Sequence, residues 1–444
     1  MANLDLAKLP QYLLQQRWFA GKGAPIKQVS ILDQVTINEP SEFVLAIVEV
    51  CYQFGNLQRY LLLVHLDANG EIGDAIEDDG FVHHLLQMIH ENRSLPSAGG
   101  VIRGDRLPGG EKFLDPLPGI GSIRRLKVEQ SNTSIVFDDR VILKLIRKLE
   151  HGLNPELEMG QFLARHSGFA AVPRLLGALQ FEGSIISSLG ILHQFVRSQG
   201  DGWSYALKTI RHSESPHPDY LREVERLGET LGNLHIALAS DPIDAAFAPE
   251  PIQQVDLQRW SSSIIGELGV TIAEASQAVP GIEGRRDALV ARAQALARLA
   301  PSGRKIRVHG DFHLGQVLRI ASGWLILDLG GEPSRTFSQR REKQSPLKDV
   351  AGMLRSFAYA SAAIELEGGK AEQYVKPSRE SFLRGYLAVI QASDLLPPEP
   401  DLSVMIDVFE IEKMLYEVRY ELQNRPDWIQ IPARTLMQAE ESRC

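Results

Sequence analysis

The 444-residue sequence has few cysteines and no excess of positive charge. Two cysteines, Cys51 and Cys444, are too few for a disulfide framework or a four-cysteine metal site. Lysine and arginine number 47 against 56 acidic residues, and this net charge of −9 argues against nucleic-acid and anionic-membrane binders, which carry basic stripes. The longest apolar runs, such as YLLLV (60–64), have the length of a strand and cannot span a membrane. The start MANLDLAKLP lacks the pattern of a secretory signal, so we expect a cytoplasmic protein.

The first 200 residues are rich in strand patterns. A helix is predicted at LAKLPQYLLQQ (6–16), followed by two strands in 42–54 and 57–66 and a helix in 78–92. A segment rich in glycine and proline, 95–119, predicts a long loop or a boundary. Strand patterns then return in SIRRLKVE (122–129), TSIVFDD (133–139) and RVILKLIRK (140–148).

After residue 200 the pattern becomes helical. Segment 221–238 repeats apolar residues at helical spacing, and segments 285–300, 349–365 and 406–424 have the same character. This segregation predicts an α+β fold in two lobes. We expect boundaries that divide the chain into residues 1–90, 91–200 and 201–444.

One polar loop, VHGDFHLGQVL (308–318), lies among apolar neighbours. The two apolar runs that follow, QVLRI and WLILD, are joined by Ala321-Ser322-Gly323 and predict a hairpin. A hairpin centred on Ser322 places Gln316 opposite Asp328. His309 and His313 do not suit a zinc pair, because Gly310 interrupts the helix that such a pair requires. We expect them to support the loop through backbone hydrogen bonds.

The oxygen donors of this hairpin suit magnesium, which prefers few protein ligands together with phosphate oxygens and water. The spacing from Asp311 to Gln316 matches the catalytic loop of kinases, in which an amide metal ligand follows the base by five residues. Asp311 would then accept the proton of the attacking hydroxyl, and Gln316 and Asp328 would hold Mg²⁺. Taken alone, Asp328 at a strand end is better explained as the cap of a turn, and only the combined spacing favours a metal ligand.

A lysine on a buried strand needs a charge partner, and Lys144 in RVILKLIRK has this position. The segment NPELEMGQFLARHSG predicts a helix that Asn154 caps, with two glutamates in its first turn. We favour Glu158 as the partner of Lys144 and keep Glu156 as the alternative. The phosphate loop is predicted at QSNTS (130–134), between two strands, with Ser131, Asn132 and Thr133 as nucleotide-binding residues. The chain has no G-x-x-x-x-G-K-[ST] motif, which argues against a P-loop enzyme.

These motifs, in this order, resemble the maltokinases, which share the aminoglycoside-phosphotransferase-like, protein-kinase-like fold, and the kinase domain fused to some trehalose synthases. The resemblance runs nearly end to end through QRWFAGKG (16–23), NPELE (154–158), QFVRSQGDGW (194–203), VHGDFHLGQVL, SPLKDVAGMLRSF (345–357) and EKMLYEVRYELQNRPDWIQIP (412–432). It implies a bilobal kinase with an N-terminal cap that uses ATP and Mg²⁺ to convert maltose to maltose 1-phosphate for α-glucan synthesis. Trehalose synthase is the implied partner.

The resemblance also carries roles to individual residues. It implies that Asp311 is the base, that Lys144 binds phosphate, and that Gln194 and Val196 meet the adenine. The C-terminal segment is similar to the family's sugar-binding helix. The implied substrate residues there are Lys413, Tyr416, Tyr420, Arg425 and Trp428, of which the first three share one helical face.

One departure from the family pattern follows Asp328. The family reads D-F-E-G-E-P, whereas this chain has Gly330 in place of the first glutamate and keeps Glu332. Two alternatives to a maltokinase therefore stay open: a kinase for another sugar such as glucosamine, and a pseudokinase that partners a trehalose synthase.

Overall fold

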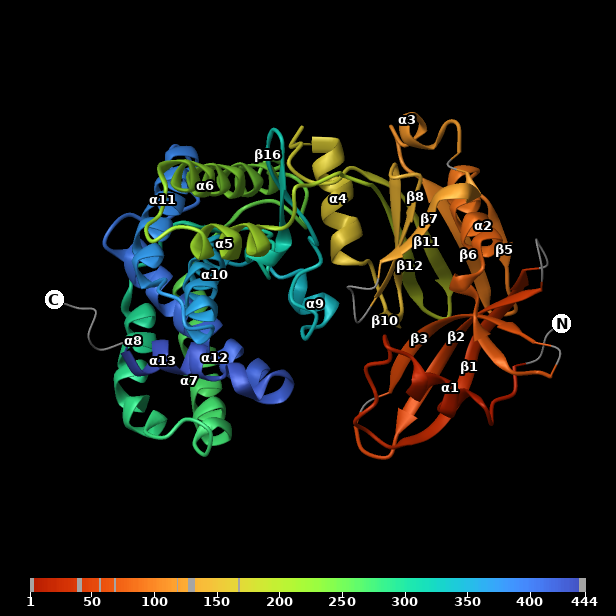
Figure 1. Ribbon diagram of the computed structural model, residues 1–444, viewed down its shortest axis with the longest axis horizontal. Coiled ribbons are helices and arrows are strands. Elements are labelled where there is room, and N and C mark those ends of the chain that lie inside the picture. The colour runs from red at the N-terminus through yellow and green to blue at the C-terminus, as the bar shows by residue number, and fades with distance from the viewer. Residues whose placement is uncertain are drawn as a thin grey trace. The chain divides into compact units, whose positions relative to one another are not determined.

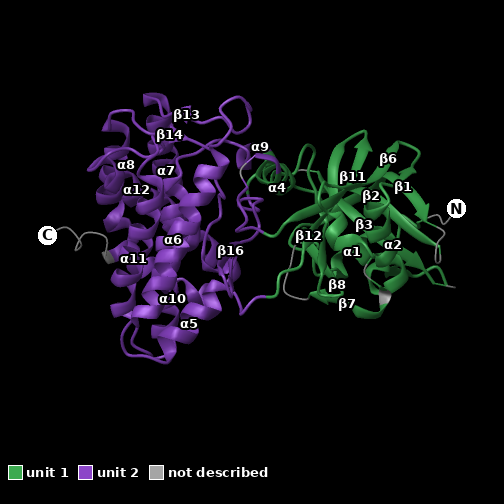
Figure 2. Cartoon of the chain, turned by 90° about the horizontal axis from the view of Figure 1, so that it is seen from above, with its two compact units in different colours: residues 1–164, 173–197, 335–337 green, residues 165–172, 198–334, 338–444 purple. Residues whose placement is uncertain are grey.

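The computed structural model describes residues 4–37, 42–55, 57–67, 69–117, 119–126, 132–166 and 168–438. The chain divides into two compact units (Figure 2): residues 1–164, 173–197 and 335–337 form the first, and the remaining residues form the second. Sheets dominate the first unit and helices the second, which confirms the predicted α+β class (Figure 1). The boundaries predicted at residues 90 and 200 stay a prediction.

Two antiparallel sheets make up the first unit. One has the order β1-β2-β3-β10, with β4 beside β3, and the other has the order β5-β6-β11-β12-β9-β8-β7. The strands of the first sheet are β1 Ile26–Ile37, β2 Phe43–Tyr52, β3 Gln58–Leu66, β4 Ile72–Asp74 and β10 Lys148–Leu149. Those of the second are β5 Ser94–Pro96, β6 Gly100–Arg106, β7 Ile123–Leu126, β8 Asn132–Phe137, β9 Val141–Ile146, β11 Leu175–Gly183 and β12 Ile186–Gln194. The helices are α1 Leu9–Gln15, α2 Asp79–His90, α3 Glu111–Leu114 and α4 Pro155–His166, whose last two residues belong to the second unit.

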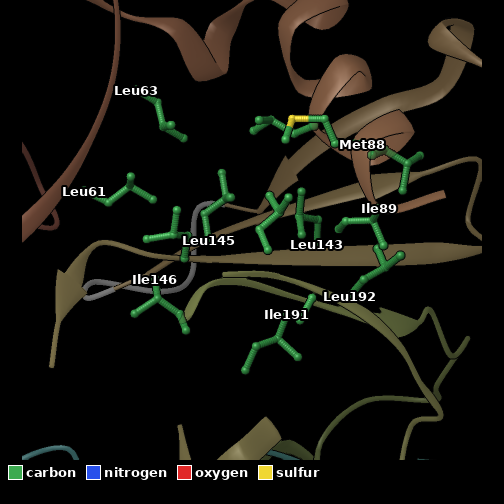
Figure 3. Packing of buried hydrophobic residues seen from close by; sticks show 14 of the residues in the cluster. Leu61, Leu63, Met88, Ile89, Leu143, Leu145, Ile146, Ile191 and Leu192 are labelled. Carbon is green, nitrogen blue, oxygen red and sulfur yellow. The ribbon is translucent and has the colours of Figure 1, made fainter. Parts of the chain in front are cut away.

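Strand β2 is apolar on both faces because each face meets a different core. Successive side chains of a strand point to opposite sides. Phe43, Leu45 and Ile47 enter the core that the two sheets share with α2, part of which Figure 3 shows. Val44 and Ala46 enter the core that α1, Trp18 and Phe19 cover.

The glycine- and proline-rich segment 95–119 is not the long loop that its composition predicts. It contains β6, which pairs with both β5 and β11, and the short helix α3. Gly104 lies where α2 approaches β6: a Cβ there would stand 2.4 Å from the Met88 carbonyl oxygen. The glycine therefore marks close packing of a helix on a strand rather than a turn.

The second unit is built mainly of helices. They are α5 Gly202–Arg211, α6 Pro218–Leu238, α7 Gln254–Ala275, α8 Arg286–Arg298, α9 Phe337–Arg340, which begins at the unit boundary, α10 Leu347–Leu366, α11 Glu372–Ile390, α12 Asp401–Asn424 and α13 Gln430–Gln438. Its short strands pair as β13 Glu250–Pro251 with β14 Arg304–Lys305, and as β15 Val317–Ile320 with β16 Gly323–Ile326. The helical stripe predicted for 221–238 lies in α6, whose Val224, Leu227 and Leu231 are buried. None of the helices in the described ranges combines the length and the apolar character needed to cross a bilayer.

Candidate active site

The predicted hairpin after residue 316 exists, but its register differs by one residue from the prediction. Val317 pairs with Ile326 and Ile320 with Gly323, so the turn consists of Ala321 and Ser322 rather than being centred on Ser322. Gln316 consequently lies opposite Leu327, whose N–H donates to the Gln316 carbonyl oxygen over 2.8 Å. A two-residue turn explains the shift, because it moves the centre of the hairpin by half a residue.

Gln316 and Asp328 nevertheless meet. The Gln316 amide nitrogen lies 3.5 Å from the Asp328 carboxylate. Asp328 has a φ of 55°, in the left-handed region that is uncommon for residues other than glycine, so the chain turns out of the strand there. Such backbone strain is typical of functional sites, because the surrounding structure must hold it in place.

The loop that carries Asp311 is fixed by a buried carboxylate, Asp349, in the first turn of α10. Asp349 accepts the backbone N–H groups of His309 and Gly310 over 2.7 and 2.9 Å. His235 of α6 lies 3.0 Å from the same carboxylate through its Nε2 atom. Burial alone would raise the pKa of Asp349, but His235 and the Gly310 N–H lower it below its usual value.

The two histidines of the loop support the backbone. His309 is buried and its Nε2 atom lies 2.7 Å from the Leu327 carbonyl oxygen, while its Nδ1 atom accepts the Asp311 N–H over 3.2 Å. His313 Nδ1 accepts the Gly315 N–H over 3.0 Å. Across the described ranges, no three His, Cys, Asp or Glu side chains gather closely enough to hold a metal ion.

One face of α10 follows the loop for two turns. Asp349, Gly352 and Ser356 are spaced three and four residues apart and so lie on the same side of the helix. Ser356 Oγ accepts the Leu314 N–H over 3.0 Å. A Cβ at Gly352 would stand 2.6 Å from the Phe312 carbonyl oxygen, so only glycine lets helix and loop approach this closely.

Asp311 forms an ion pair with Lys413 of α12. The Lys413 ammonium lies 2.9 Å from Asp311 Oδ1, and the two side chains are 20% and 14% exposed. Burial would raise the pKa of Asp311, but Lys413, together with His313, lowers it to about 2. Burial would lower the pKa of Lys413, but Asp311 raises it above the usual value. Both groups therefore carry their charges at neutral pH.

Aromatic side chains collect along and beyond the end of α12. The Tyr416 and Tyr420 rings stack with centroids 6.1 Å apart, and Trp428 stacks on Tyr359 at 6.2 Å. Arg425 lies over the Trp428 ring at 4.8 Å and is bound to Glu421. We call Tyr359, Tyr416, Tyr420 and Trp428 the C-terminal aromatic group.

In the first unit, Lys144 of β9 pairs with Glu156 over 2.9 Å. The preference for Glu158 as its partner was wrong, and the alternative is the partner that the structure has. Residues two apart on a helix project about 200° apart around its axis, so the two glutamates face opposite ways. Asn154 caps this helix as predicted, its Oδ1 atom accepting the Glu156 N–H over 2.8 Å. Glu158 is also buried, and its nucleotide-binding role stays a prediction.

The predicted phosphate loop is described only in part, because Ser131 lies outside the described residues. Asn132 and Thr133 begin β8, and the Thr133 hydroxyl accepts a hydrogen bond from Arg147 Nε over 3.1 Å. Gln194 ends β12, with its N–H bound to the Arg174 carbonyl oxygen over 2.8 Å, and Val196 follows the strand. The nucleotide roles of these residues stay predictions.

Two functional candidates carried no predicted role. Asp349 lies within SPLKDVAGMLRSF, where it resembles an ordinary acidic residue in a first helical turn. Tyr359 lies in a segment of helical periodicity, where it is typical of a core residue, and its exposed fraction is 9%. Asp349 binds the loop 39 and 40 positions before it in the chain, and Tyr359 stacks on Trp428, 69 positions after it. No local pattern predicts such pairings.

Two family models match the chain. Residues 122–331 match the phosphotransferase enzyme family, and residues 12–82 match the maltokinase N-terminal cap domain. Among curated proteins, the glucosamine kinase of Streptacidiphilus jiangxiensis is 27% identical over 85% of each chain. The glucosamine kinase of Mycolicibacterium smegmatis is 24% identical over 83% of this chain and 90% of its own.

Solved structures of glucosamine kinase share the fold. One crystal form superimposes with a TM-score of 0.75 at 23% identity and 99% coverage of both chains. Another, in complex with glucosamine, ADP and inorganic phosphate, gives a TM-score of 0.70 at 23% identity and 94% coverage of both. The kinase-like fold thus extends over nearly the whole chain.

Proposed function

We propose that this chain, which belongs to the maltokinase family of kinase-like phosphotransferases, transfers the γ-phosphoryl group of ATP to a hydroxyl of a sugar. The observation that carries the proposal is the largely buried carboxylate of Asp311 on a loop whose backbone Asp349 binds, in the same unit as the Gln316–Asp328 pair. Such an arrangement suits proton removal from an alcohol followed by phosphoryl transfer.

In this proposal Asp311 accepts the proton of the attacking hydroxyl. The hydroxyl oxygen forms the new bond to phosphorus, and ADP leaves with the electrons of the bond that breaks. Lys144, paired with Glu156, neutralises phosphate charge, and Asn132 and Thr133 lie on the strand beside it. Gln194 and Val196 are assigned to the adenine, as the resemblance implies.

Gln316 and Asp328 fit a magnesium site. Both offer oxygen, the donor that Mg²⁺ prefers, since rotation of the Gln316 amide by 180° presents its oxygen in place of its nitrogen. A site with two protein ligands also leaves positions for phosphate oxygens and water. When bound, Mg²⁺ would neutralise the charge of the phosphates.

We propose maltose as the acceptor. Sugars stack their apolar faces on aromatic rings, and the C-terminal aromatic group offers several. Two carboxylates beside it already have partners: Glu421 binds Tyr359 and Arg425, and Glu417 binds Arg355 over 2.7 Å. A neutral sugar therefore suits this surface better than a cationic amino sugar, whose ammonium group needs a carboxylate.

Glucosamine is the second candidate acceptor, because two curated relatives that match most of the chain are named glucosamine kinases. The partnership with trehalose synthase, a role in α-glucan synthesis and a cytoplasmic location stay predictions of the resemblance.

The deciding experiment measures ADP release with Mg·ATP against maltose, glucose, glucosamine and trehalose. We expect turnover on maltose with a 1-phosphate product, and about a hundredfold to ten-thousandfold loss of kcat in Asp311→Asn with nucleotide binding retained. Turnover on glucosamine alone would replace the acceptor and keep the mechanism. Nucleotide binding without turnover on any sugar would refute the proposal in favour of a pseudokinase.

A further inference from the structure

Lys413 lies between the catalytic loop and the C-terminal aromatic group. Its ammonium is 2.9 Å from Asp311 Oδ1 and 4.5 Å from the centroid of the Tyr416 ring. Tyr416 in turn stacks on Tyr420. A single side chain of α12 therefore contacts both the residue assigned to proton removal and an aromatic ring assigned to the sugar.

The two oxygens of the Asp311 carboxylate have different surroundings. Oδ1 is held by Lys413, whereas Oδ2 lies 3.8 Å from His313 Nε2, beyond hydrogen-bond distance. A lysine ammonium has three N–H donors, and one of them binds Oδ1. The others can donate to an oxygen of the sugar, which would bring its hydroxyl toward Oδ2.

The charges around this pair come from several elements. His309 and His313 of the loop act on Asp311, and Glu332 acts on Lys413. Asp328 lies close enough to act on His313. Burial on its own favours the neutral carboxylic acid at Asp311, and Lys413 is the largest opposing influence on its pKa.

We propose that Lys413 is a positioning residue that keeps Asp311 ionised and aims its Oδ2 atom at the acceptor hydroxyl. This inference rests on the proposed function. In the step that it serves, the hydroxyl proton moves to Oδ2, the hydroxyl oxygen bonds to the γ-phosphorus, and ADP departs. Lys413 donates no proton in this step. It acts through Asp311 and through the orientation of the sugar.

The test is the pH profile of kcat in Lys413→Met and Lys413→Arg. In the wild type, Asp311 titrates near pH 2, so the acid limb that it causes lies below the usable range. Without the cation its pKa rises, and the acid limb moves up by about one to three pH units. We expect kcat at pH 7 to fall about tenfold to a hundredfold in Lys413→Met. Lys413→Arg keeps the cation and should therefore retain the wild-type pH profile of kcat.

Arg419→Met is the matched control, because Arg419 is a cation of the same helix that pairs with Glu267. It should leave kcat and the pH profile unchanged. If Lys413→Met kept the wild-type kcat and pH profile while the wild type phosphorylated a sugar, the inference would be wrong. If the wild type phosphorylated no sugar, the proposed function would fail instead. Nucleotide binding and the thermal unfolding midpoint show whether each variant is folded. If Lys413→Met is misfolded, the kcat and pH profile of Lys413→Gln test the inference instead.

Discussion

Replacing Asp349 with alanine is expected to destabilise the protein by about 3–5 kcal/mol, the usual loss when one partner of a buried charged network is removed. The Asp349 side chain is 1% exposed and binds the N–H groups of His309 and Gly310 and the His235 ring at 2.7 to 3.0 Å. Alanine removes the acceptor of the buried His309 N–H and of the Gly310 N–H, and it removes the partner of the buried His235 Nε2 atom. Since a domain is stable by only about 5–15 kcal/mol, the loss should be plain in urea unfolding.

Two variants sharpen this measurement. Asp349→Asn keeps the shape but loses the charge, and we expect about 1.5–3 kcal/mol of destabilisation from its weaker hydrogen bonds. Asp394→Ala is the control, because its side chain is 70% exposed and pairs with Arg304 at the surface. It should cost less than about 1 kcal/mol.

The pH dependence follows from the direction of the pKa shift. The pKa of Asp349 is lower in the folded protein than in the unfolded chain. Its contribution is therefore complete above the unfolded pKa, about 4, and is lost as the pH falls through the lower folded value. The difference in stability between wild type and Asp349→Ala should close in acid. A loss no larger than that of Asp394→Ala, or one that grows in acid, would refute the role assigned to Asp349.

Three further predictions concern other parts of the site. Lys144→Met and Glu156→Gln should each raise the KM for Mg·ATP by about tenfold or more, because each removes one charge of a largely buried ion pair. A double variant with a lower nucleotide KM than either single one supports the pairing, and unchanged KM values would contradict it. Gly352→Ala should lose about 1–3 kcal/mol in urea unfolding, because its methyl group would meet the Phe312 carbonyl oxygen, whereas Gly266→Ala in α7, with open space around it, should gain about 0.5–1 kcal/mol. Trp428→Ala should raise the KM for maltose about tenfold with little change in kcat, since it removes binding surface rather than a reacting group. Steady-state kinetics with maltose test this prediction, and a fall in kcat alone would contradict the role of Trp428 in sugar binding.

Most helices and strands could be predicted from the sequence because their periodicity is local. The stripe of α6 and the continuous apolar runs of β2 and β3 each lie within a single segment. The strand β6 is an exception, and its cause is a tertiary contact. β6 was missed because glycine, which usually indicates a loop, serves there to let α2 approach at Gly104.

The candidate site was predictable where its residues lie close together in the sequence. The spacing of Asp311, Gln316 and Asp328 identified these three residues as site candidates. In the structure the side chains of Gln316 and Asp328 lie 3.5 Å apart, although the hairpin register differs from the prediction. A register depends on the length of the turn, which composition alone left uncertain by one residue.

The sequence by itself determined the fold class, the loop that carries Asp311 and the helix that Asn154 caps, because each rests on neighbours within a few residues. Only the tertiary structure decided that Glu156 rather than Glu158 faces Lys144, and that Asp349 and Lys413 hold the loop. These pairs join segments 12 to 102 residues apart. Their choice depends on how helices rotate and pack against the loop and the strand, and the packing of the whole chain sets that rotation.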